Sequence, residues 1–416
     1  MRIKYISFLV LLASVFALNL NAAKHYVGGD ISLLPDYEDA KAKYFDQNGK
    51  PVSDVLSFLH EQGMNAMRVR LFVNPGDFPN NDPNAKQDLE YIIPLCQRIK
   101  NTGFDLMLDF HYSDTWADPV KQWTPKAWQG LSNTELYQKI YDYTKETLET
   151  LKANGVVPDF IQTGNEISYG MLWGSSTDSS SSLKKVYTGS ENNWTYFTTL
   201  LRKAIQACNE VCPDALIVLH NERVAKPEML EFFYSQMDKY KIAYDIIGLS
   251  YYPYFHGDMS VLDKALTVLE EKFPSKQIMV VETGYSYAWE VPGTDKPVDY
   301  PYSNDGQNQF AQDLVKTLEA HETCSGLFWW WLEYNAYGTS LSGWYNAPLF
   351  DSRNGRATKA LKTICSFNNN MDAVEDVFMD QVGDDRWFDL QGRPIVAPSA
   401  PGLYIHNGKV VAVPNI

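Results

Sequence analysis

The sequence predicts an α/β fold, a parallel (β/α)8 (TIM) barrel with long βα loops and a short C-terminal β appendage. Three observations predict it. Short apolar runs alternate eight times with runs of helical period, connections from helix to strand are short, and connections from strand to helix are long. Eight such units in a row favour a barrel over a doubly wound sheet, which usually stops near about six strands.

Each predicted strand is a short apolar run of the kind that is buried in a parallel sheet. The predicted strands are residues 26–31, 66–72, 104–111, 160–166, 216–222, 245–252, 277–283 and 326–332. Each is followed by a segment of helical period. The predicted helices are residues 52–62, 89–100, 134–153, 194–210, 227–239, 261–272, 306–321 and 356–365. The long loops all follow strands, so the carboxyl-terminal face of the barrel is where we expect an active site.

The N-terminus has the pattern of a secretory signal, and this pattern sets the first domain boundary. Arg2 and Lys4 precede an apolar run over residues 6–20, and Ala22-Ala23 supply small residues for cleavage. The apolar run is about 15 residues, short of the ~20 that a membrane-spanning helix needs. We therefore expect a signal peptide over residues 1–23 and an exported protein in the periplasm, at the cell surface or outside the cell.

The composition changes after the last predicted helix. We expect a catalytic barrel over residues 24–367 and a linker plus a short β segment over residues 368–416. Asn407-Gly408 between alternating apolar runs predicts a hairpin in this tail, which is too short for a core of its own. With its DLQGR and GLYI-NGK stretches, the tail resembles the C-terminal segment found on many exported proteins of the Bacteroidetes.

Charge and cysteine content exclude several classes of partner. The chain has 36 Lys and Arg against 51 Asp and Glu, a net charge of −15, so it lacks a basic surface for nucleic acid or anionic membranes. Its five cysteines are scattered, which argues against a disulfide scaffold, and the odd count leaves at least one thiol free. Cys208 and Cys212 lack the spacing of a zinc site. We expect no cofactor and a monomer.

Two carboxylates stand where a barrel enzyme places its active site. Glu166 follows the fourth predicted strand and Glu282 ends the seventh, and both strands are otherwise strongly apolar. A single strand-end glutamate is more often a solvated or salt-bridged charge. Two of them on strands three apart face each other across the barrel mouth, which is the arrangement that glycoside hydrolysis requires.

Other polar residues at the strand ends are consistent with this interpretation. Arg68 and Arg70 share one parity on the second strand and can hold a carboxylate ionised. The competing constellation is a metal barrel built from four side chains, His111, His220, Asp109 and Glu222. An amidohydrolase-like site would also need a His-x-His pair ending the first strand, where the chain has Gly28-Gly29-Asp30.

Four stretches of the sequence resemble glycoside hydrolase family 53, the endo-β-1,4-galactanases. They are TGNE at residues 163–166, VETGY at 281–285, DFHYSDTWADP at 109–119 and GLSYYP at 248–253. The resemblance spans about residues 28–364, and the HYSD-x-WADP pattern is its most specific part.

The resemblance implies a role for individual residues. Glu166 matches the acid/base, Glu282 the nucleophile and Asn165 the ligand of the sugar 2-hydroxyl. The remaining matches are substrate-binding: Arg68, His111, Asp114, Trp116, Asp118, Trp173, Tyr252 and Trp330. Trp330 matches the floor beneath the reacting sugar. Some bacterial members bind calcium in the loop after the seventh strand, but residues 287–295 offer too few oxygen ligands here, so we expect no metal.

The implied activity is endo-hydrolysis of β-1,4-galactan, the side chains of pectin, with retention of configuration. A retaining pair should have carboxyls about 5–5.5 Å apart, with a high pKa on the acid and, beside Arg68, a low pKa on the nucleophile. The alternatives are another retaining barrel glycosidase, such as a mannanase or glucanase, and a non-catalytic glycan-binding barrel.

Overall fold

The computed structural model describes most of the chain. It covers residues 24–77, 82–178, 184–187, 191–291, 293–294, 296–335, 337–341 and 347–368, and the strand residues 387–388, 394–395, 402–406 and 409–413. The expected signal peptide and the linker residues 369–370 lie outside this range. The chain divides into two compact units, Met1–Asn370 and Met371–Ile416.

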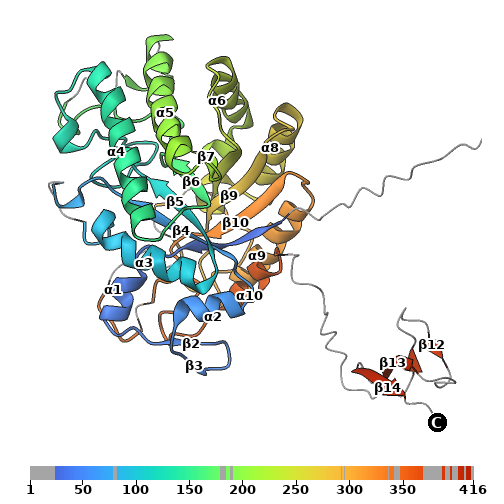
Figure 1. The fold of residues 1–416 in the computed structure, drawn as a ribbon. Coiled ribbons are helices and arrows are strands. Elements are labelled where there is room, and N and C mark those ends of the chain that lie inside the picture. The colour runs from blue at the N-terminus through green and yellow to red at the C-terminus, as the bar shows by residue number, and fades with distance from the viewer. Residues whose placement is uncertain are drawn as a thin grey trace, which may run out of the picture. The chain divides into compact units, whose positions relative to one another are not determined.

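Eight parallel strands close into a barrel in the first unit (Figure 1). The strands are β1 (Tyr26–Asp30), β4 (Ala66–Leu71), β5 (Asp105–Phe110), β6 (Phe160–Thr163), β7 (Leu216–Asn221), β8 (Ile246–Tyr251), β9 (Gln277–Thr283) and β10 (Cys324–Trp329). Consecutive strands are neighbours, and β1 closes the ring by pairing with both β10 and β4. The predicted fold class is confirmed.

Helices surround the barrel, as Figure 1 shows. They are α1 (Leu34–Asp39), α2 (Val55–Glu61), α3 (Leu89–Thr102), α4 (Asn133–Ala153), α5 (Glu191–Val211), α6 (Pro227–Lys239), α7 (Pro253–His256), α8 (Met259–Lys272), α9 (Asn304–Glu319) and α10 (Lys359–Cys365). Local signals set several of their ends: Ser132 and Glu135 form a capping box on α4, and Gly103 ends α3 with φ 100°. Every predicted helix is present, with ends within three residues of the prediction.

The interior of the barrel is divided into two levels. One level is apolar and includes Met107, Phe160, Val218, Met279 and Phe328. Further along the same strands, toward their carboxyl ends, the inward positions are polar. They include Asp30, Arg68, Arg70, Asp109, Gln162, His220 and Ser250, all at most 1% exposed. A buried polar level is costly unless its members bind one another or a ligand, so it marks this end of the barrel as the functional end.

Two predicted strands end three residues earlier than expected, while the other six end within one residue of the prediction. The fourth, predicted to residue 166, stops at Thr163 because Gly164 turns the chain with φ 105°. The eighth, predicted as 326–332, runs from Cys324 to Trp329, and Trp331 leaves it with φ 52°. Between the first predicted strand and the first full-length helix, α2, the chain also forms α1 and a small hairpin of β2 (Tyr44–Phe45) and β3 (Pro51–Val52). In both strands the turn places functional side chains just beyond the last strand residue.

The second unit contains an antiparallel sheet of β11 (Trp387–Phe388), β12 (Pro394–Ile395), β13 (Gly402–His406) and β14 (Lys409–Val413). His406 pairs with Lys409, so β13 and β14 form the predicted hairpin, although Asn407 and Gly408 lie outside the described residues.

Two further sequence expectations concern the chain as a whole. All five cysteines are buried and unpaired, as expected for a chain without a disulfide scaffold. In the described part of the chain, no helix combines the length and the apolar character that crossing a membrane requires.

Candidate active site

Glu166 stands on a strained turn at the end of β6. Gly164 has φ 105°, and a Cβ there would lie 2.6 Å from Ile167 Cγ2, so only glycine fits. Two residues later Glu166 itself has φ 47°, in the left-handed region that non-glycine residues avoid. Strain of this kind persists where the surrounding structure holds a residue in a functional position.

Glu282 reaches the barrel interior through an irregularity in β9. Met279 and Val281 belong to the interior apolar level, so strict alternation would direct Glu282 outward. The pairing of β8 with β9 shifts register at this point, and Ser250 pairs with Glu282 directly after Leu249 pairs with Val280. A register shift re-aims the side chain. Glu282 therefore turns inward to Arg68, although Val281 before it is also interior.

Both glutamates line one cavity of about 620 Å³ at the carboxyl ends of the strands. Its other lining residues are Trp116, Ala117, Asp118, Pro119, Val120, Lys121, Asn165, Glu222, Tyr252, Phe255, His256, Trp330 and Trp331. This volume lies within the range of small-molecule sites, about 300–1,000 Å³. The cavity thus brings together the two candidate catalytic groups and three indole rings.

A charged network lies behind Glu282. Arg68 Nη2 is 2.9 Å from Glu282 Oε1, and it donates hydrogen bonds to Asp109 Oδ2 at 2.8 Å and Asn165 Oδ1 at 2.9 Å. Arg68 Nη1 binds Asp30 Oδ2 at 3.3 Å. From the other side, Tyr252 donates to Glu282 Oε2 at 3.4 Å. Glu282 is therefore held between a guanidinium and a phenol.

Glu166 has a different set of neighbours. Ser250 donates its hydroxyl proton to Glu166 Oε1 at 2.7 Å, and His220 Nε2 lies 2.8 Å from the same hydroxyl. Burial raises the pKa of Glu166 well above its usual range, and the negative charges of Glu282 and Glu222 raise it further. These surroundings favour the protonated form of the Glu166 carboxyl.

The pKa of Glu282 departs from the sequence expectation. Burial raises it to about 7, and Arg68 only partly opposes that rise, while Asp109 and Asp30 add to it. The expectation of a low pKa is therefore wrong, because Arg68 shares its charge with two aspartates. The groups that act most strongly on the pKa of Glu166 are carboxylates and the Ser250 hydroxyl, so Glu166 is still the carboxyl expected to carry the proton.

Two predicted substrate ligands, Arg68 and His111, lie behind the cavity and do not line it. Arg68 is fully buried under Glu282 and Asn165. His111 is 2% exposed; its Nδ1 accepts from the backbone N–H of Ala117 at 3.0 Å, and Nε2 lies 3.0 Å from Asp109 Oδ2. His111 therefore influences the site by orienting Asp109, which binds Arg68. The predicted substrate ligands that line the cavity are Trp116, Asp118, Asn165, Tyr252 and Trp330.

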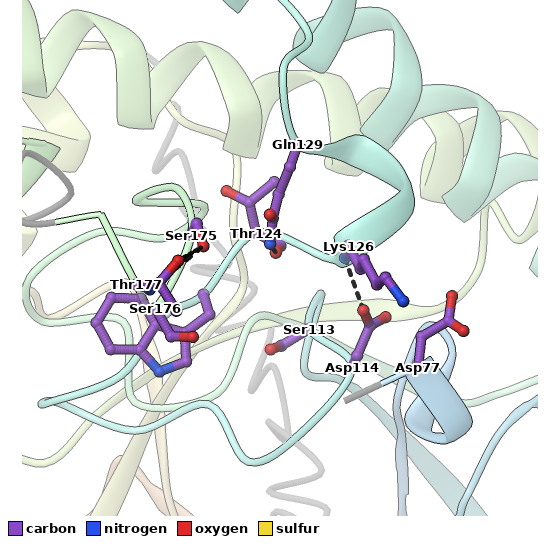
Figure 2. Close-up of a pocket in the computed structure, with 10 residues that line it drawn as sticks. Asp77, Ser113, Asp114, Thr124, Lys126, Gln129, Ser175, Ser176 and Thr177 are labelled. Atoms are coloured by element: carbon purple, nitrogen blue, oxygen red, sulfur yellow. Dashed lines mark hydrogen bonds between the residues drawn. The ribbon is translucent and has the colours of Figure 1, made fainter. Parts of the chain in front are cut away.

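Asp114 and Trp173 were predicted to bind substrate, but neither side chain lines the cavity that holds the two glutamates. Asp114 is 4% exposed, and its carboxylate accepts from the backbone N–H groups of Asn74 at 3.0 Å and Lys126 at 2.7 Å. It lines a separate pocket of about 250 Å³, which Figure 2 shows between Asp77 and Lys126 on one side and Ser175 to Thr177 on the other. Trp173 is 1% exposed, with Nε1 bound to the carbonyl of Tyr169. Both side chains stabilise the loops that form the cavity wall.

Several cavity residues were not predicted as binding residues. Glu222, which follows β7, is 8% exposed and pairs with Arg223 at 2.7 Å and Ser168 at 2.7 Å. Phe255 and His256 come from α7, a short helix with no clear sequence signal, and Trp331 follows Trp330. The sequence signal for Glu222 was its position at a strand end, but there it was considered only as a metal ligand.

The metal-site alternative has no support in the geometry. His220 binds Ser250 and Asn165, and Asp109 binds Arg68, so these side chains serve one another. Within the described residues, no three His, Cys, Asp or Glu side chains are grouped as metal ligands would be.

Comparisons with known proteins agree with the geometry. The family model described as "Glycosyl hydrolase family 53" matches residues 26–364. "Arabinogalactan endo-beta-1,4-galactanase A" of Aspergillus niger is 30% identical over 344 residues, 79% of this chain and 92% of that protein. "Endo-beta-1,4-galactanase" of Bacillus subtilis is 29% identical over 313 residues, 73% of this chain and 68% of that protein.

A solved structure also matches. The "Ignisphaera aggregans GH53 catalytic domain" superposes with a TM-score of 0.72 and 31% identity, covering 83% of this chain and 97% of that one. The family match includes both strand-end glutamates and the loops that form the cavity. The chain therefore belongs to glycosyl hydrolase family 53.

Proposed function

We propose that this glycoside hydrolase cleaves internal β-1,4-galactosidic bonds of galactan, including the side chains of pectin, with retention of configuration. The observation that carries the proposal is the pair Glu166 and Glu282, from opposite sides of the barrel, in one indole-walled cavity. Named relatives at about 30% identity are endo-β-1,4-galactanases, which supports the choice of sugar.

In the first step Glu282 attacks the anomeric carbon while the bond to the leaving oxygen breaks. Glu166 gives its proton to that oxygen, and a covalent glycosyl ester forms on Glu282. In the second step water attacks the same carbon and gives its proton to Glu166, and the ester bond breaks. Ionised Glu282 and protonated Glu166 are the starting states, and the contrast between Arg68 and Ser250 favours them.

The hydrogen bond from Ser250 also decides which oxygen of Glu166 carries the proton. Because Ser250 donates to Oε1, that oxygen is an acceptor, and the acid proton is left on Oε2. Oε1 is bound toward β8, so Oε2 is the oxygen free to meet the leaving group.

Asn165 is oriented to bind the reacting sugar. Its Oδ1 accepts from Arg68 at 2.9 Å, and one hydrogen of Nδ2 is used by the carbonyl of Ala117 at 2.8 Å. The second Nδ2 hydrogen remains to donate to a sugar hydroxyl. A contact of this kind strengthens in the transition state of glycoside hydrolysis.

The rim of the cavity suits a polymer. Val120 and Phe255 line it and are 72% and 42% exposed, so apolar surface continues outward beyond the two glutamates. Aromatic faces bind sugar rings through area, while Asp118 supplies hydrogen bonds that can distinguish an axial from an equatorial hydroxyl. Early products from galactan should therefore be mixed oligosaccharides.

The test is incubation of the protein with linear galactan, mannan and xylan, followed by chromatography and NMR of the first products. Galactan should be cut to oligosaccharides that first appear as the β-anomer. Release of galactose alone from chain ends would contradict the endo assignment, an α-anomer would contradict retention, and cleavage of mannan or xylan in preference would contradict the substrate.

We also propose, from the sequence pattern of residues 1–23, that the protein is exported. A monomer stays our expectation for its oligomeric state. Mass spectrometry of the protein from its native host should find a mature chain beginning at Lys24. Retention of the first 23 residues, or an oligomer in light scattering, would contradict these two expectations.

A further inference from the structure

Arg70 lies behind the cavity wall with three indole rings around it. It is fully buried on β4, and its Cζ is 4.8 Å from the ring centroid of Trp116, 5.1 Å from that of Trp330 and 4.9 Å from that of Trp331. The rings also contact one another, with centroids of Trp116 and Trp330 6.0 Å apart and those of Trp330 and Trp331 6.0 Å apart. All three tryptophans line the cavity.

The indoles explain an otherwise costly feature of Arg70. Its Nη1 binds Asp30 Oδ1 at 2.5 Å, but Nε and Nη2 are buried and have no hydrogen-bond partner among the described residues. A buried guanidinium with free N–H groups is strongly disfavoured unless something else interacts with them. Ring faces attract a cation, and the attraction grows when water is excluded. The three rings therefore take the place of the missing acceptors.

Arg70 is also connected to Glu282 through one carboxylate. Asp30 Oδ1 binds Arg70, and Asp30 Oδ2 binds Arg68 at 3.3 Å, which in turn contacts Glu282. Among the described residues, the other titratable groups that interact with the charge of Arg70 are Glu333 after β10, Tyr37 on α1 and Tyr91 on α3. Without Arg70, the charge of Asp30 would be compensated by Arg68 alone.

We propose that Arg70 is a positioning residue for the glycosidase reaction. Its planar guanidinium holds the three indoles that wall the sugar site, and its charge balances Asp30, so that Arg68 remains available to Glu282. The inference rests on the proposed function for its kinetic consequences, while the ring arrangement can be tested without a substrate.

The Arg70→Lys variant tests the hold on the rings. Lysine keeps the positive charge beside Asp30 but presents a compact ammonium, which offers the indoles less surface to pack against than the broad guanidinium. We expect KM for galactan to rise about tenfold with kcat within about twofold, because ring binding weakens in ground and transition state alike. Near-UV circular dichroism should lose tryptophan signal without substrate.

The Arg70→Met variant tests the charge. The groups that face Glu282 are Asp30 on β1, Arg68 on β4, Asp109 on β5, Glu166 after β6 and Tyr252 after β8. Removing a nearby positive charge raises the pKa of Glu282. Because Glu282 must be ionised to attack, the acidic limb of kcat/KM should move to higher pH in Arg70→Met and stay in place in Arg70→Lys.

The control is Arg98→Lys, since Arg98 is a part-exposed arginine paired with Glu38 on the outside of the barrel. It should keep the wild-type KM, pH profile and tryptophan signal. An Arg70→Lys enzyme with unchanged KM and tryptophan signal would overturn the role in ring positioning.

Asp30→Asn keeps the charge role testable if Arg70→Met does not fold. This variant removes the negative charge that Arg70 balances, so the acidic limb of kcat/KM should move to lower pH. An acidic limb that does not move would overturn the charge role. A wild-type enzyme inactive on galactan would instead contradict the proposed substrate.

Discussion

Glu166 and Glu282 line the same cavity, but the groups that surround them differ in charge. Glu282 contacts Arg68, whereas Glu166 is bound by the neutral hydroxyl of Ser250 and lies near Glu222. Burial raises the pKa of both carboxyls, and Arg68 partly opposes the rise at Glu282. Two glutamates can thus be suited to opposite roles because the side chains that contact them differ in charge.

The largest expected effect comes from Glu282→Ala. Without a nucleophile no glycosyl ester forms, so hydrolysis of galactan and of an activated aryl β-galactoside should both fall by about 10⁴-fold or more. Steady-state rates on the two substrates check this, with circular dichroism to confirm the fold. Wild-type-like cleavage of the aryl galactoside would assign the nucleophile to another residue.

Glu166→Ala should separate the two substrates. The alkoxide leaving from galactan needs a proton, so its cleavage should fall by about 10²–10⁴-fold, the usual contribution of a general acid. A phenolate leaves without help, so its release in the first turnover should remain close to wild type. Stopped-flow measurement of phenolate release tests this, and equal losses on both substrates would refute the assignment of Glu166 as the acid.

Glu222→Gln tests how far a neighbouring negative charge sets the pKa of Glu166. The charge of Glu222 raises the pKa of Glu166, so neutralising it lowers that pKa. Glu166 must be protonated to act, and the alkaline limb of kcat/KM should therefore move to lower pH, by about 0.5–1 unit. The matched control is Glu210→Gln on the surface of α5, which should leave the profile unchanged. An unmoved limb in Glu222→Gln would mean that its charge does not reach the acid.

The smallest effect is expected from removing the tail after Asn370. The barrel unit, Met1–Asn370, contains both glutamates and the whole lining of the cavity. Activity on galactan should stay within about twofold of the full-length protein, since the deleted sheet is a separate unit. A truncated protein that folds but loses most of its turnover would show that the tail contributes to the site.

How far the sequence could predict the site is clear from particular residues. Glu166 and Glu282 were identified because a carboxylate at the end of a strongly apolar strand is unexpected in a core. Trp173 and Asp114 were predicted from the family resemblance to bind substrate, but both side chains fold back and bind the backbone. A loop sequence does not record which way its side chains turn, since that depends on which backbone groups need partners.

The sequence was sufficient to predict the barrel, the face on which the candidate site lies and the two candidate glutamates, because apolar period and strand-end composition are local properties of the chain. The remaining features depend on contacts between strands in the folded protein. The register shift that turns Glu282 inward, the sharing of Arg68 between Glu282 and two aspartates, and the three indoles around Arg70 each join residues from several strands. Such charge balances depend on burial and on distances of a few ångströms, which exist only once the barrel has closed.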